Sequence, residues 1–91
     1  MYRPTVAEKF AIEARLNMIL GAKEYDRLFL GFECGELEGD VVNVYARSEY
    51  CALRIDSRYA PHIAVAVQSV IGRPVNAVTV LPKNLLDSKL S

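Results

Sequence analysis

The chain has 91 residues, enough for one domain with its own hydrophobic core, and its 11 basic and 11 acidic side chains cancel. The zero net charge excludes a field over the whole molecule that would attract nucleic acid or an anionic membrane, so any such binding needs a local cluster. No apolar run reaches the ~18 residues of a membrane-spanning helix, and we expect a cytoplasmic protein without membrane contact. Cys34 and Cys51 lie in apolar stretches without the spacing of zinc ligands, which predicts reduced core residues.

A helix is predicted after a short tail over residues 1–5. Thr5 can cap this helix, and Glu8 stands three positions later, which completes the capping-box pattern. The apolar spacing extends the helix over residues 6–20, and Gly21 closes it.

The apolar residues of this helix form two stripes on nearly opposite sides, whereas an ordinary surface helix has one. The first stripe contains Ile12, Leu16, Ile19 and Leu20. The second stripe contains Ala7, Phe10, Ala11, Ala14 and Met18. Either elements of the same domain cover both stripes, or the second one, through Phe10, Ala14 and Met18, is a docking or self-association surface that forms a homodimer.

A shorter helix is predicted over residues 22–30, and a β-hairpin follows it. The first strand covers residues 32–37, where the alternation slips near Gly35 and indicates a bulge. A Gly-Asp turn then leads into a second strand over residues 41–46, with alternate apolar residues on one face.

Ser48 caps the third helix, in which Cys51, Ile55 and Tyr59 recur at intervals of four and should face inward. Pro61 lacks the amide hydrogen that a helix interior requires, so we expect the helix to kink or restart there.

The third helix stops at Gly72 and Pro74, a last strand covers residues 75–81, and residues 82–91 form a polar tail. The order helix, helix, strand, strand, helix, strand predicts an α+β domain over residues 6–81. It should contain a three-stranded sheet with the helices packed on one face.

The sequence contains no motif that indicates a catalytic site. The glycines form neither a phosphate loop nor a dinucleotide fingerprint, and His62 has no second histidine or cysteine nearby in sequence. The cluster of glutamates in the first strand predicts a solvated strand edge rather than a catalytic carboxylate pair. These are Glu33, Glu36 and Glu38. We therefore expect a protein that is not an enzyme and needs no metal or cofactor.

One helical face carries the residue types of a binding site. Tyr50, Arg54 and Arg58 recur at intervals of four, and Arg47 precedes them at the end of the hairpin. Guanidinium groups beside an aromatic ring can bind phosphates, stack on bases or hold an acidic protein. The alternative is a solvated face whose arginines pair with neighbouring carboxylates, those of Glu49 and Asp56.

Residues 24–29 have the sequence EYDRLF, residues 44–50 have the sequence VYARSEY, and a Gly-x-Pro motif precedes the last strand. In these segments the chain resembles the N-terminal interaction domain of the bacterial replication initiator DnaA family. The resemblance implies a KH-like fold of order ααββαβ that self-associates through its first helix. It also implies docking of the replicative helicase, an initiator or initiation regulators through Glu24 and Tyr50, and weak contact with single-stranded DNA near Arg54.

The resemblance covers roughly residues 6–81, nearly the whole of the predicted ordered chain, and it implies either a part of a longer initiator or a stand-alone relative. A competing interpretation is a small KH-like protein that binds single-stranded nucleic acid. Its binding residues would be Arg47, Tyr50, Arg54 and Arg58. The zero net charge and the lack of a Gly-x-x-Gly loop stand against it.

Overall fold

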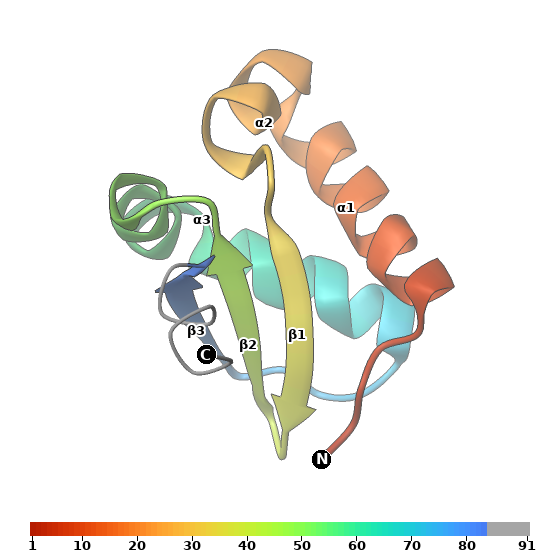
Figure 1. The fold of residues 1–91 in the computed structure, drawn as a ribbon. Helices are drawn as coiled ribbons and strands as arrows, with labels where there is room; N and C mark the ends of the chain where they lie inside the picture. The colour runs from red at the N-terminus through yellow and green to blue at the C-terminus, as the bar shows by residue number, and fades with distance from the viewer. Residues whose placement is uncertain (84–91) are drawn as a thin grey trace.

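A computed structural model describes residues 1–83 of the chain. The elements are α1 (Val6–Leu20), α2 (Ala22–Phe29), β1 (Glu33–Glu38), β2 (Val41–Ala46), α3 (Glu49–Ile71) and β3 (Ala77–Pro82). The central strand β2 pairs antiparallel with β1 and parallel with β3. Figure 1 shows the sheet in front with α1 and α3 behind it, so the helices cover one face. The predicted α+β class, element order and layers are confirmed.

The helices begin and end at the residues predicted to cap them. The Thr5 hydroxyl accepts a hydrogen bond from the amide of Glu8, and the Glu8 carboxylate accepts one from the amide of Thr5, so the capping box is complete. The Ser48 hydroxyl accepts from the amide of Cys51 and starts α3. Gly72 ends α3 with a φ of 76°, a left-handed conformation that glycine adopts without strain.

Residues 1–5, which we predicted as a tail, are anchored to the sheet by Tyr2. Its backbone exchanges two hydrogen bonds of 2.8 Å with Leu37 of β1. Its hydroxyl donates to the carboxylate of Glu8 over 2.7 Å, and the guanidinium carbon of Arg73 lies 4.5 Å from its ring centroid. The N-terminal segment therefore covers part of the outer edge of β1.

The predicted bulge lies in β1. The strand begins and ends one residue later than the predicted range of 32–37, and its register with β2 shifts around Gly35. A Cβ atom at Gly35 would lie 2.8 Å from the carbonyl oxygen of Asn43 and 2.8 Å from the ring of Tyr45. Only glycine therefore lets the two strands approach this closely.

α3 is one helix that contains Pro61 in its interior. Proline removes one backbone hydrogen bond and crowds the preceding turn, which bends a helix. Figure 1 shows the first part of α3 nearly end-on and its second part from the side, as a bent helix requires. The expected kink is present, and the alternative of a helix that restarts is wrong.

The last strand begins later than predicted. β3 covers Ala77–Pro82 rather than 75–81, because the amide of Val75 donates to a side chain of α3 and not to the sheet. Pro82, which we placed in the polar tail, is buried and ends the strand. The remainder of that predicted tail, residues 84–91, lies outside the described residues.

One hydrophobic core lies between the sheet and the helices. Its largest fully buried side chains are Phe29, Ile12, Leu16, Leu28, Leu37, Ile55 and Ile63. Cys34 and Cys51 are free thiols and buried, as predicted, and burial raises the pKa of the Cys34 thiol to about 12. Within residues 1–83, no helix is long and apolar enough to cross a lipid bilayer.

We expect Gly35→Ala to lower the free energy of unfolding by about 1–3 kcal/mol, because the added methyl group would push β1 away from β2. Urea unfolding followed by circular dichroism measures this change. Gly39→Asn is the matched control, since Gly39 has a φ of 62° with nothing near its missing Cβ, and asparagine tolerates that conformation. Equal stability of Gly35→Ala and the wild-type chain would contradict the close approach of the strands.

Candidate functional site

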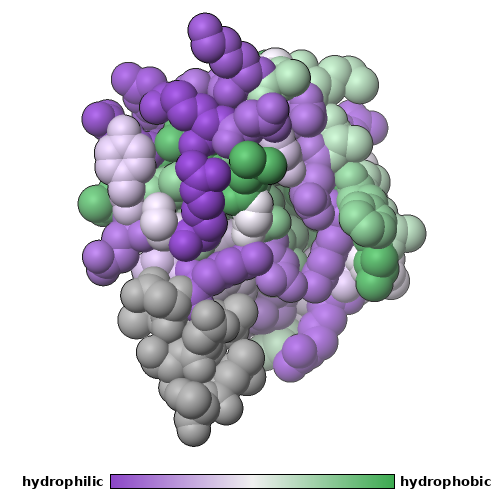
Figure 2. Space-filling model, turned by 45° about the horizontal axis from the view of Figure 1, so that its top comes forward, coloured by the Kyte–Doolittle hydropathy of each residue, from purple (hydrophilic) through white to green (hydrophobic). Residues whose placement is uncertain are grey.

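A surface formed by α2 and the first half of α3 brings together exposed guanidinium groups and a tyrosine. We call it the arginine surface, and it consists of Arg27, Arg47, Tyr50, Arg54 and Arg58. The first comes from α2, the second from the link between β2 and α3, and the others from α3. Figure 2 shows hydrophilic side chains over the upper left of the molecule, where α2 and the start of α3 lie.

Glu24 joins α2 to α3 beside this surface. Its carboxylate accepts hydrogen bonds from Nε of Arg27 over 2.9 Å and from Nη2 of Arg27 over 3.0 Å. The hydroxyl of Tyr59 on α3 also donates to it. The bonds from Arg27 and then from Tyr59 stabilise the anion, and they lower the pKa of Glu24 to about 2. Glu24, predicted as a contact residue, is therefore already engaged and positions both of its partners.

Arg47 connects the hairpin to the end of α2. Its Nη2 donates to the backbone carbonyl of Arg27 over 2.9 Å. The last carbonyls of a helix have no partner inside the helix, so a guanidinium donor there satisfies one of them. Arg47 thereby holds α2 against the start of α3.

Tyr50 and Arg54 form an exposed pair on the surface. The guanidinium carbon of Arg54 lies 5.4 Å from the centroid of the Tyr50 ring, within the range of a cation–π contact. A hydrogen bond from Arg54, the charge of Arg54 and the charge of Arg27 lower the pKa of the Tyr50 hydroxyl. The Tyr50 residue is 56% exposed, so the pair is presented to solvent.

The carboxylates next to these arginines along α3 do not neutralise them. Within residues 1–83, neither Arg54 nor Arg58 forms an ion pair with Glu49 or Asp56. The predicted ion pairs with Glu49 and Asp56 are therefore absent among the described residues. The surface has four guanidinium groups, and Glu24 is the carboxylate that forms an ion pair with one of them, Arg27.

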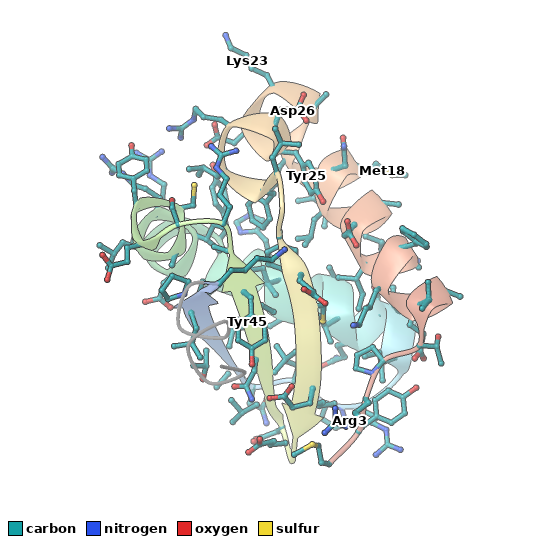
Figure 3. The ribbon with its side chains drawn as sticks, viewed as in Figure 1. Arg3, Met18, Lys23, Tyr25, Asp26 and Tyr45 are labelled. Carbon is teal, nitrogen blue, oxygen red and sulfur yellow. The ribbon has the colours of Figure 1, made fainter. Side chains whose placement is uncertain are left out.

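The second apolar stripe of α1 is a separate surface. Phe10 is 66% exposed and Met18 is 85% exposed, and Ala14 between them is also exposed, whereas Ile12 and Leu16 of the first stripe are fully buried. The alternative that the domain itself covers both stripes is wrong within residues 1–83. Figure 2 shows an apolar ridge on the right, where α1 lies, and Figure 3 shows Met18 pointing away from the molecule.

The sequence interpretation missed two members of the network around Glu24. Arg27 stands three positions after Glu24 on the same helix, a spacing that commonly forms an ion pair, so this contact could have been predicted. Tyr59 was predicted to face inward, and its ring does pack against Phe29, but its hydroxyl reaches a carboxylate 35 positions earlier. No pattern along the chain indicates that contact.

The histidine and two of the β1 glutamates have the following contacts. His62 is exposed, and its ring centroid lies 5.5 Å from that of Tyr59. Glu33 pairs with Lys9 and Lys83, and Glu36 accepts a hydrogen bond from Asn43. In residues 1–83, no group of three or more metal-ligating side chains is placed to hold a metal ion.

No protein-family model matches the sequence, and no curated protein matches it. We therefore infer the function from the residues of this chain.

We expect Glu24→Gln to destabilise the protein near neutral pH and to have little effect in strong acid. The pKa of Glu24 falls from 4.5 to about 2 on folding, so its anion stabilises the folded state above about pH 4.5, and this contribution is lost as the pH falls towards about 2. Thermal unfolding of both proteins between pH 7 and pH 2 should show a Tm difference that narrows over that interval. Asp26→Asn is the control for net charge, because it removes the charge of an exposed carboxylate on the same helix. A Tm difference of constant size would show that the ionised carboxylate is not what stabilises the junction.

Proposed function

We propose that the arginine surface docks an acidic macromolecular partner and that the domain is a protein-interaction module of DNA replication initiation. The observation that carries this proposal is the exposed Tyr50 ring with the guanidinium group of Arg54 over it. Arg58 follows one turn further along α3, and neither arginine forms an ion pair within residues 1–83. Arginine and tyrosine dominate binding hot spots, because a guanidinium fork binds carboxylates at two points and a tyrosine ring buries a large area.

The resemblance to the DnaA N-terminal domain supports the class of partner. In this proposal the partner is the replicative helicase, an initiator or an initiation regulator, and the domain works in the cytoplasm without catalysing a reaction. Tyr50 and Arg54 contact the partner, while Glu24 holds Arg27 and Tyr59 in position. This arrangement differs from a direct contact through Glu24, because that carboxylate already accepts three hydrogen bonds from the side chains of α2 and α3.

The exposed stripe of α1 supports self-association in the same proposal. A contiguous apolar strip on a helix is unfavourable in water and is stabilised when a second copy covers it. The stripe is flat, since Ala7, Ala11 and Ala14 surround Phe10, and small side chains let two helices approach closely. A homodimer through Phe10, Ala14 and Met18 would leave the arginine surface free for a partner.

A single-stranded nucleic acid is the second candidate ligand, favoured by the guanidinium group of Arg54 over the exposed Tyr50 ring. Bases stack on tyrosine and arginine, and phosphates pair with guanidinium groups. For single strands, a plot of the logarithm of the binding constant against the logarithm of the salt concentration has a slope of about −0.7 per phosphate contact. Four arginines would therefore give a slope of about −3. A fluorescent oligothymidylate titrated at several salt concentrations distinguishes the two ligands, because tight binding with that slope would favour nucleic acid.

We expect Tyr50→Ala and Arg54→Ala each to weaken binding to the purified replicative helicase or initiator of the same cell by about 2 kcal/mol, roughly thirtyfold, as hot-spot residues do. Calorimetric titration measures the affinity, and circular dichroism checks that the fold is retained. Arg3→Ala is the matched control, because Figure 3 shows Arg3 at the opposite end of the molecule from α2. Unchanged affinity of both variants would remove the arginine surface as the docking site.

We expect Phe10→Glu to shift the protein towards the monomer, because a carboxylate in the apolar stripe must lose water to enter a dimer interface. Sedimentation velocity over a range of protein concentrations measures the association. Val65→Glu is the control, since Val65 is 64% exposed but lies on α3. Equal association of the Phe10 variant and the wild-type chain would exclude the stripe from self-association.

A further inference from the structure

The two edges of the sheet are protected very differently. The edge strand β1 has a bulge at Gly35, a bridge from Tyr2 along its outer side, and three glutamates at positions 33, 36 and 38. Charges, bulges and covering segments are the devices by which proteins prevent another strand from pairing with a sheet edge. The β1 edge is therefore closed to a further strand.

The other edge strand, β3, has none of these devices apart from its final proline. Its sequence, AVTVLP, contains no charged residue, and its register with β2 continues without a shift over all six residue pairs. Among residues 1–83, β2 is the one strand that pairs with it. An uncharged, regular edge of this kind is a template for an additional strand.

The register with β2 assigns the backbone groups of this edge. The amides of Asn76 and Ala77 both donate to the carbonyl of Asp40, over 2.8 and 3.3 Å, and Ala77 is the first residue in register with β2, opposite Val41. The last residue in register, Pro82, has no amide hydrogen to give β2, so the donors to β2 are those of Ala77 and every second residue after it. Because successive residues of a strand direct their amide and carbonyl groups to alternate sides, those of Val78 and Val80 face the free edge. Pro82 has no amide hydrogen and ends the row of donors.

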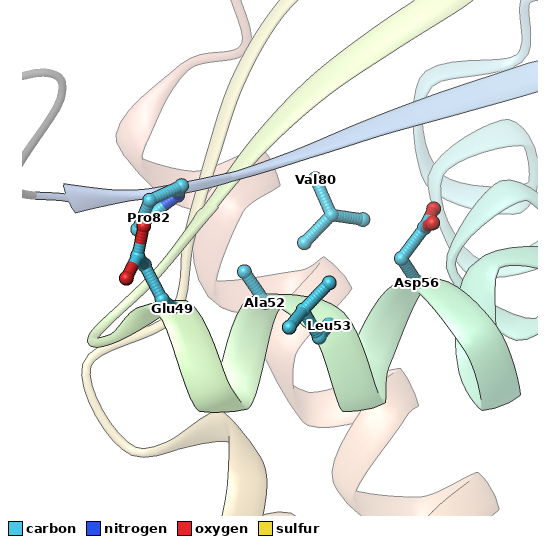
Figure 4. A pocket seen from close by; sticks show the side chains of 6 residues that line it. All are labelled: Glu49, Ala52, Leu53, Asp56, Val80 and Pro82. Carbon is cyan, nitrogen blue, oxygen red and sulfur yellow. The ribbon is translucent and has the colours of Figure 1, made fainter.

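A groove runs beside this edge, between β3 and the first half of α3, and Figure 4 shows its walls. It has a volume of about 300 Å³ and is lined by Glu49, Ala52, Leu53, Asp56, Val80 and Pro82. Leu53 is 71% exposed, an unusual position for a leucine on a helix that packs on a sheet. Glu49 and Asp56 lie towards opposite ends of the groove in Figure 4, and neither forms an ion pair within residues 1–83.

We propose that the β3 edge and this groove bind an extended peptide segment of a partner protein, with apolar side chains at alternate positions and lysine or arginine on both sides of them. The peptide adds a strand to the sheet by hydrogen bonding to Val78 and Val80, and its apolar side chains cover Leu53. The carboxylates of Glu49 and Asp56 attract the basic residues and repel phosphates, which excludes nucleic acid from this groove.

This site is independent of the arginine surface. The two lie on different sides of α3 and have opposite charge, because Arg54 and Arg58 belong to the other side of the helix. Each would select a different partner segment, one acidic and one basic, and both could be occupied at once. Loss of binding at one site should leave the other unchanged, so the two proposals are tested separately.

The test is a titration of the ¹⁵N-labelled full chain with a capped peptide of alternating valine and threonine between terminal lysines. We expect saturable shifts of the amide signals of Leu53, Val78 and Val80. N-methylation of the peptide amides that face β3 should abolish binding, because it removes the hydrogen-bond donors. Replacing the terminal lysines by glutamates should weaken binding about tenfold or more.

Two matched variants locate the site on α3. Leu53→Asn should weaken peptide binding about tenfold or more, because it removes the apolar wall of the groove. Val65→Asn should leave the affinity unchanged, since Val65 is similarly exposed on the same helix but outside the groove. Both variants replace an exposed side chain, so both should retain the wild-type amide spectrum away from the substitution.

Several results would overturn the proposal. These are the absence of saturable shifts, equal binding of the glutamate-flanked peptide, shifts centred on the arginine surface, or the same groove shifts with oligothymidylate. Concentration-dependent shifts of β3 without peptide would assign the edge to a second copy of the chain. Nuclear Overhauser contacts between Leu53 and residues 84–91 in the free protein would assign the groove to the chain's own terminal segment.

Discussion

The structure depends on the packing of one long helix, α3, against a sheet of three strands. Its buried side chains lie on one stripe that includes Ile55, Ile63 and Val67, and this stripe covers β3 and β2. A helix with a single buried stripe exposes the sides next to it. On one side the sequence places Tyr50, Arg54 and Arg58, and on the other it places Glu49, Leu53 and Asp56. The same helix therefore builds both candidate binding sites.

The contact between α2 and α3 determines the shape of the basic side. Glu24 accepts hydrogen bonds from Arg27 and from Tyr59, and Arg47 donates to the end of α2. These contacts order side chains that would otherwise be free to move, so less conformational entropy is lost when a partner binds. The exposure of Tyr50 and Arg54 costs the fold little, because neither side chain contributes to the hydrophobic core.

The zero net charge conceals a separation of charge within the molecule. Arg27, Arg47, Arg54 and Arg58 gather at α2 and the start of α3, whereas glutamates occupy β1 and carboxylates flank the groove beside β3. Such a separation can orient a partner and choose between partners without a strong overall field. The exposed apolar stripe of α1 adds a third surface of different chemistry.

The sequence by itself determined the features that depend on a few neighbouring residues. Thr5, Ser48 and Gly72 mark helix ends because capping needs only local backbone groups. Gly35 indicates the bulge, and Pro61 indicates the bend, for similarly local reasons. The spacing of Tyr50, Arg54 and Arg58 placed them on one exposed face, because helix geometry alone sets that relation.

The tertiary structure alone decided which segments meet. The bond from Tyr59 to Glu24 spans 35 positions, and the exposure of the α1 stripe depends on how α1 docks on the rest of the domain. The groove exists because β3 pairs parallel to β2 at the edge of the sheet, beside α3. Strand order and helix docking are set by the total burial of distant side chains, and a local pattern carries no information about that sum.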